Sequence, residues 1–226
     1  LKNRQNELLG FSSEMASVLA GQLAGKPYPA QRIKDAWIRF LWHQFHDDLP
    51  GTSIPVVYQR YSLPDEDAAI EQFTAIRQEG LEALTAKMDT RSAGTALMVF
   101  NPLSVQRQEP VLAQVEFPDG QAPEFVRVYG PDGKEVLSQV LERNGKQLSI
   151  AFMAATPACG AAVYDVRAAD APCGLPSALK ASQTGLANAS LEVKLDGNGD
   201  IVSIRDIRTG RETLSARLER VAVGGG

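Results

Sequence analysis

The sequence is poor in cysteine and in aromatic residues, and it has no long apolar run. The two cysteines, Cys159 and Cys173, lie in a region rich in proline, glycine and alanine. Two thiols could pair in an oxidising compartment, but they do not make a disulfide framework, so unpaired cysteines are the safer expectation. No apolar run reaches the length of a bilayer span, and the opening Leu1-Lys2-Asn3-Arg4 is not a signal peptide. These absences predict no membrane partner.

Excess basic charge is also missing. The chain has 23 Lys and Arg against 27 Asp and Glu, and its net charge is −4. The basic residues are scattered, which predicts no nucleic-acid partner. A glycine-rich phosphate loop, a nucleophile elbow and a cysteine-based metal motif are absent as well. Nucleotide-dependent and serine-hydrolase chemistry therefore find no support.

The composition is that of an ordinary globular protein, with 44% hydrophobic and 22% charged residues. A chain of 226 residues exceeds one typical domain, so we expect several modules. There is no initiating Met, and the first residues have a helical pattern. We therefore expect the sequence to be a piece of a longer protein.

The first 90 residues carry three amphipathic helical patterns separated by Gly and Pro. We expect their apolar side chains in the core of an antiparallel three-helix bundle. The first stripe is Leu8, Phe11, Met15, Val18 and Leu19; the second is Ile33, Trp37, Phe40, Leu41 and Phe45; the third is Ala69, Ile70, Phe73, Ile76, Gly80, Leu81 and Leu84.

The periodicity changes to that of β-strands near residue 95, which predicts an antiparallel β module over 91–168. Its clearest hairpin turns at Asn144-Gly145. Residues 169–187 are rich in Ala, Pro, Gly and Ser and predict a linker. Two alternating strands then flank Gly197-Asn198-Gly199. The predicted fold class is α+β with several domains.

Both histidines lie where the second helical pattern meets Pro50-Gly51. Three residues along a helix are about 300°, so His43 and His46 are expected on one helix face, with Asp47 following His43 at i+4. Imidazole and carboxylate groups are the usual ligands of zinc. The alternative needs no metal, because a histidine in the last turn also interacts well with the exposed helix carbonyls.

The surrounding string favours the metal. Gln44-Phe45-His46-Asp47, then Leu49 to Ile54 and Val57-Tyr58, closely resembles the start of the middle domain of family 38 glycoside hydrolases, the α-mannosidases. The resemblance implies that His46 is one zinc ligand, beside a His and two Asp of a preceding domain, and that Asp47 contacts the metal-bound sugar. Asp48 replaces the apolar residue of many members, which leaves two roles open: a partner that orients His46, or a solvated surface residue.

The resemblance also implies where catalysis resides. Retaining glycoside hydrolysis needs two carboxyl groups flanking one bond. In the family both come from the N-terminal α/β domain, so we expect no catalytic residue in this fragment and no activity from it alone. His43 could complete a His-x-x-His-Asp metal site, but we favour a packing or orienting role. Strings at Val99–Ser104 and Gly199–Glu212 resemble the entries to the first β domain and to a large C-terminal β-sandwich domain, here 188–226.

Three functions follow as hypotheses. The first is part of a zinc-dependent retaining α-mannosidase that hydrolyses terminal α-mannosyl linkages, with a mannose-containing glycan as substrate. The second is a non-catalytic carbohydrate-binding or scaffolding module of the same fold. The third is a helical interaction module in which His43 and His46 are ordinary surface residues.

Overall fold

The computed structural model describes residues 1–117 and 120–215. It divides into two compact units, Leu1–Cys173 and Gly174–Gly226, and residues 216–226 of the second unit lie outside the described part. Within the described residues, the first unit holds all the helices and seven strands, and the second holds β8 to β11. The predicted succession of a helical bundle and antiparallel β modules is confirmed.

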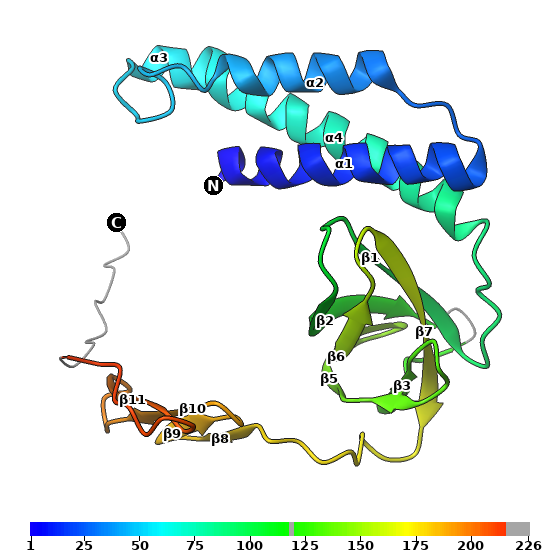
Figure 1. The fold of residues 1–226 in the computed structure, drawn as a ribbon, viewed down its shortest axis with the longest axis vertical. Helices are drawn as coiled ribbons and strands as arrows, with labels where there is room; N and C mark the ends of the chain where they lie inside the picture. The colour runs from blue at the N-terminus through cyan, green and yellow to red at the C-terminus, as the bar shows by residue number, and fades with distance from the viewer. Residues whose placement is uncertain (118–119, 216–226) are drawn as a thin grey trace. The chain divides into compact units, whose positions relative to one another are not determined.

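Three long helices run side by side in the bundle (Figure 1). The helical elements are α1 (Lys2–Ala24), α2 (Ala30–Trp42), α3 (Pro55–Val57), the π-helix η1 (Tyr58–Ser62) and α4 (Leu63–Thr85). Pro64 lies in the first turn of α4, followed by Asp65 and Glu66, as the sequence predicts for a helix start. Among the described helices, none is long and apolar enough to cross a membrane.

The seam between α1 and α4 is built from small residues, which corrects the predicted core face of α1. A Cβ added at Gly80 of α4 would lie 3.0 Å from the backbone of Ala16. Because the backbones are so close, large side chains do not fit between them. Leu8 is 72% exposed, and Phe11 and Val18 are exposed too. The buried residues of α1 are Asn6, Leu9, Gly10, Ser12, Ser13, Ala16, Ser17 and Ala20.

The other two stripes agree better with the prediction. On α2 the aromatic Phe40 and the aliphatic Ile33 are buried, but Leu41 and Phe45 are exposed, so these two assignments were wrong. Phe45 lies beyond the end of α2 at Trp42, and Leu41 lies on the exposed side of the helix. The predicted face of α4 is buried at Ala69, Phe73, Ile76, Gly80 and Leu84.

The β module of the first unit is a pair of antiparallel sheets, of order β1-β7-β3-β4 and β2-β6-β5. Its strands are β1 (Thr95–Asn101), β2 (Arg107–Glu116), β3 (Phe125–Tyr129), β4 (Glu135–Val136), β5 (Ser138–Asn144), β6 (Gln147–Thr156) and β7 (Gly160–Ala169). A single core that includes Phe152 and Tyr164 joins the sheets. Gly145 has φ 57° in the β5–β6 turn, as the predicted hairpin requires.

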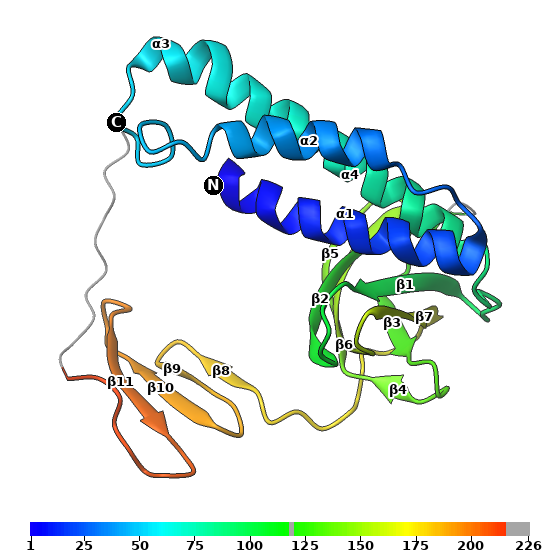
Figure 2. The same cartoon turned by 45° about the horizontal axis from the view of Figure 1, so that its top comes forward.

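The second unit is a four-stranded antiparallel sheet of order β11-β10-β9-β8 (Figure 2). The strands are β8 (Lys180–Ser182), β9 (Gly185–Ala187), β10 (Leu191–Leu195) and β11 (Ile201–Asp206). The pair predicted around Gly197 to Gly199 is confirmed as β10 and β11. However, β8 and β9 lie inside the predicted linker. Gly185 permits this pairing, because a Cβ there would lie 2.5 Å from the carbonyl oxygen of Val193.

Candidate functional site

The loop between α2 and α3 carries the residues that the sequence singles out. Helix α2 ends at Trp42, and His43 is its C-cap, with its N–H bonded to the carbonyl of Phe40 at 3.3 Å. The chain then turns through residues 43–51 and reaches α3 at Pro55. Figure 2 shows this loop beside α3 at one end of the bundle. His46 and Asp47 therefore belong to a turn and not to a helix.

His43 is buried, and both of its ring nitrogens are engaged. The side chain is 4% exposed. Nδ1 lies 2.6 Å from Oδ2 of Asp48, and Nε2 lies 3.0 Å from Oδ2 of Asp65 in the first turn of α4. Burial lowers the pKa of His43, but the hydrogen bonds to Asp65 and Asp48 outweigh it, so the pKa is raised above 6.5. The two carboxylates thus favour the protonated form of the ring.

Asp48 is tied to the π-helix as well. The hydroxyl of Ser62 donates to the Asp48 carboxylate, with 2.8 Å to each oxygen. The hydroxyl of Tyr58 lies 3.0 Å from the carbonyl of Asp48 and 3.2 Å from that of Asp47, and it accepts the N–H of Ser53 at 3.1 Å. The π-helix precedes Pro64, which has no N–H to continue the α-helical ladder. Its position places both hydroxyls against the loop.

His46 and Asp47 lie on the outside of this arrangement. Their side chains are 76% and 59% exposed, and Nε2 of His46 lies 3.4 Å from Oδ2 of Asp47. The His46 ring also packs on Phe45, with 4.1 Å between ring centroids. The imidazole of His46 and the carboxylate of Asp47 are therefore both accessible to a ligand at this surface.

The expectation that His43, His46 and Asp47 share one helix face was wrong. The helix ends before His43, so the i and i+4 relation does not apply. His43 is turned inward and His46 outward. Both nitrogens of His43 already face carboxylates on opposite sides of the ring, a geometry that does not suit a metal shared with His46. The side chain of Asp48 is 12% exposed, so it is not a solvated surface residue, and its hydrogen bonds are to His43 and Ser62 rather than to His46.

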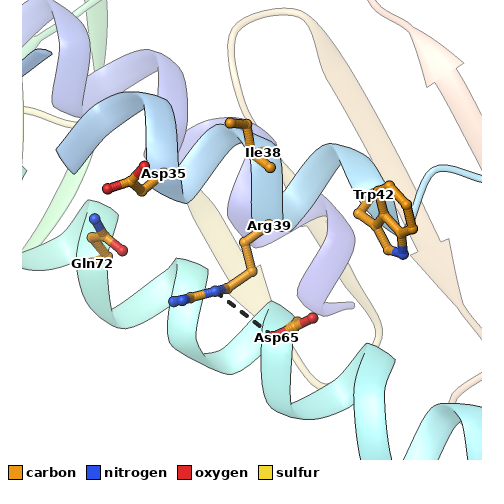
Figure 3. Close-up of a pocket in the computed structure, with 6 residues that line it drawn as sticks. All are labelled: Asp35, Ile38, Arg39, Trp42, Asp65 and Gln72. Carbon is orange, nitrogen blue, oxygen red and sulfur yellow. Dashed lines mark ion pairs between the residues drawn. The ribbon is translucent and has the colours of Figure 1, made fainter. Parts of the chain in front are cut away.

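Asp65 links the buried histidine to an open groove between α2 and α4 (Figure 3). Oδ1 of Asp65 lies 3.7 Å from Nε of Arg39, which reaches across from α2. The groove has a volume of about 510 Å³ and is lined by Asp35, Ile38, Arg39, Trp42, Asp65 and Gln72. Sequence reasoning missed Ser62, Asp65 and Arg39 as partners, because each also fits an ordinary helix start or helix surface.

The donor set of the loop fits part of a zinc site. A neutral imidazole and a carboxylate are both zinc ligands, and His46 is not held by any other group than Asp47 and Phe45 in the contacts described above. Zinc sites use three or four protein ligands. Within the part of the chain that the structure describes, no cluster of three or more His, Cys, Asp or Glu side chains could hold a metal. The pair is therefore at most a share of a site.

The comparisons with known proteins identify a relative of the helical bundle. Residues 1–84 match the family model described as the alpha mannosidase middle domain. Residues 1–84 of this chain are therefore similar to the α-mannosidase middle domain. The resemblance predicted from the string around His46 is thereby confirmed, and the buried His43 network lies inside the matched residues.

A solved α-mannosidase supports the fold of the remainder. The crystal structure of an alpha-mannosidase from Enterococcus faecalis V583 superposes with a TM-score of 0.70 at 18% identity, covering 93% of this chain and 28% of that one. At this identity the likeness concerns the fold. The helical bundle and the β modules after it thus share their architecture with about a quarter of a larger protein. A search of curated proteins found no match.

Proposed function

We propose that this chain is part of a zinc-dependent retaining α-mannosidase that removes terminal α-mannosyl residues from glycans. In this proposal His46 is one zinc ligand, Asp47 contacts the sugar, and the remaining ligands come from a preceding domain of the same protein. The supporting observation is that His46 and Asp47 project together from the loop of the α-mannosidase middle domain. The side chains of His43 and Asp48, on either side of this pair, are turned inward.

The chain's own residues then have distinct tasks. His46 would hold the ion through a ring nitrogen, and Asp47 would accept hydrogen bonds from sugar hydroxyls, which fixes the orientation of the ring. Bound zinc supplies a template that holds sugar hydroxyls. The two carboxyl groups of retaining hydrolysis are assigned to the preceding domain. Asp48 is not a candidate for either, because His43 and Ser62 already occupy its oxygens.

The test is an assay of the full-length protein on a chromogenic α-mannoside, with and without a chelator. We expect the chelator to abolish turnover and His46→Ala to lower kcat/KM by roughly 100-fold or more, because metal binding supplies several kcal/mol. Lys34→Ala is the matched control, since Lys34 is exposed on α2 away from the loop.

The results also separate the alternatives. Activity that survives both the chelator and His46→Ala would overturn the zinc assignment. Binding of a mannose-containing glycan without turnover, with zinc supplied, would instead favour a non-catalytic carbohydrate-binding module. A full-length protein that neither binds nor turns over mannosides, and in which His46→Ala changes only local stability, would be the interaction module.

A further inference from the structure

Hydrogen bonds hold the loop between α2 and α3 in place on both sides of His46 and Asp47. On one side the ring of His43 is buried against Asp48 and Asp65. Next to it, Nε2 of Gln44 donates to Oδ1 of Asn3 on α1 at 2.6 Å. These bonds fix the chain just before the exposed pair.

The other side is fixed from the π-helix. Ser62 donates to the side chain of Asp48, and the hydroxyl of Tyr58 meets two consecutive carbonyls, those of Asp47 and Asp48. The same hydroxyl accepts the N–H of Ser53. The hydroxyl of Tyr58 therefore connects Asp47 and Asp48 to Ser53, on the two ends of this part of the loop.

We propose that His43, Asp48 and Tyr58 are positioning residues, which hold the loop so that His46 and Asp47 project in a fixed geometry before any ligand arrives. This inference rests on the proposed function and extends it to three residues that touch neither metal nor sugar. The physical basis is entropic: a donor held in place by its neighbours loses less conformational freedom on binding. It also accounts for a carboxylate at position 48, where the resembled family often has an apolar residue, because Asp48 binds both the ring of His43 and the hydroxyl of Ser62.

The experiment uses Tyr58→Phe, which removes one hydroxyl and leaves the ring. Tyr61→Phe is its control, because Tyr61 lies on the same π-helix and its side chain is exposed. In the full-length protein, zinc affinity is measured by competition with a chromophoric chelator. We expect Tyr58→Phe to weaken zinc binding by roughly 10- to 100-fold, the range for partners that orient metal ligands. Tyr61→Phe should bind as the unchanged protein does.

Two further readouts distinguish positioning from simple loss of fold. Excess zinc should restore the α-mannosidase activity of Tyr58→Phe but not that of His46→Ala. Hydrogen exchange at the amide of Ser53 should accelerate in Tyr58→Phe, with the thermal midpoint little changed. Asp48→Asn, which keeps the shape and one acceptor oxygen, should lose less zinc affinity than Asp48→Ala.

The outcome is decisive in either direction. If Ser53 exchanges faster while Tyr58→Phe binds zinc as tightly as the unchanged protein, loop positioning is refuted. If the unchanged full-length protein does not bind zinc, the proposed function fails, and the positioning role fails with it. Zinc binding by the unchanged protein together with a weakened Tyr58→Phe supports both.

Discussion

The pair of His43 and Asp48 gives the sharpest quantitative prediction for this fold. The Asp48 side chain is only 12% exposed. In His43→Leu its carboxylate loses the imidazole and keeps the hydrogen bond from Ser62. Breaking a buried pair from one side costs about 3–5 kcal/mol. Asp48→Leu costs less, about 1–3 kcal/mol, because one nitrogen of His43 loses its acceptor while the other keeps Asp65.

The double substitution should be much milder than the sum of the two. Two leucines of similar volume leave no uncompensated charge between α2 and the loop, so we expect a net cost of below about 2 kcal/mol. The coupling free energy from urea unfolding of the four proteins should be at least about 2 kcal/mol. Additive costs within about 0.5 kcal/mol would refute the idea that this buried contact holds the loop.

The same histidine predicts how stability depends on pH. Its pKa is raised in the folded protein despite the opposing effect of burial, through the bonds to Asp65 and Asp48. A raised pKa means that the contribution is fully present below about pH 6.5, the unfolded value, and is lost as pH rises through the folded pKa. The stability difference between the unchanged protein and His43→Gln should therefore shrink above pH 6.5. Burial raises the pKa of the nearby Glu66. Glu66 is present in both proteins, so its contribution to the pH dependence largely cancels in the stability difference.

Two matched pairs test the bundle itself by urea unfolding. Leu9→Ala should cost about 2–5 kcal/mol and Leu8→Ala less than about 1 kcal/mol, because Leu9 is 6% exposed and Leu8 is 72% exposed; a larger cost for Leu8→Ala than for Leu9→Ala would mean that α1 is turned as its apolar stripe predicts. Gly10→Ala should cost about 1–3 kcal/mol, since the new Cβ would lie 2.7 Å from an indole ring atom. Gly25→Ala, at φ 70° in open space, should cost about 1 kcal/mol from backbone strain alone; a larger loss there than at Gly10 would refute the packing argument.

Local chemistry predicted much of the fold. Asn-Gly favours a two-residue hairpin turn, and Gly145 adopts the positive φ that such a turn requires. Helix α4 starts where proline and acidic residues stand in the first turn, and its apolar stripe is its buried face. In both places the residues that decide the structure are neighbours along the chain. These two features can therefore be predicted from the local sequence.

Helix α1 shows where such reasoning fails. Its large apolar side chains repeat with helical spacing, but the pattern does not reveal how closely a partner helix approaches. Gly80 of α4 lies against Ala16, so the seam accepts serine, alanine and glycine. The hydroxyl of Ser13 donates to the carbonyl of Gly10, and that of Ser17 to the carbonyl of Ser13, which makes their burial possible. The sequence does carry a sign of the true core face, a second stripe of small residues on the opposite side of α1.

The candidate site shows a related failure with a geometric cause. Had α2 continued through the motif, Asp48 would follow His43 by five residues, or about 140° around the helix axis after one full turn. No hydrogen bond between the two side chains is possible at that angle. The observed 2.6 Å contact exists because the helix ends at Trp42 and the chain turns back. The same turn moves His46 and Asp47 to the outside. Burial of one histidine and exposure of the other are thus two results of a single chain reversal, and a sequence reading that assumes a continuous helix loses both.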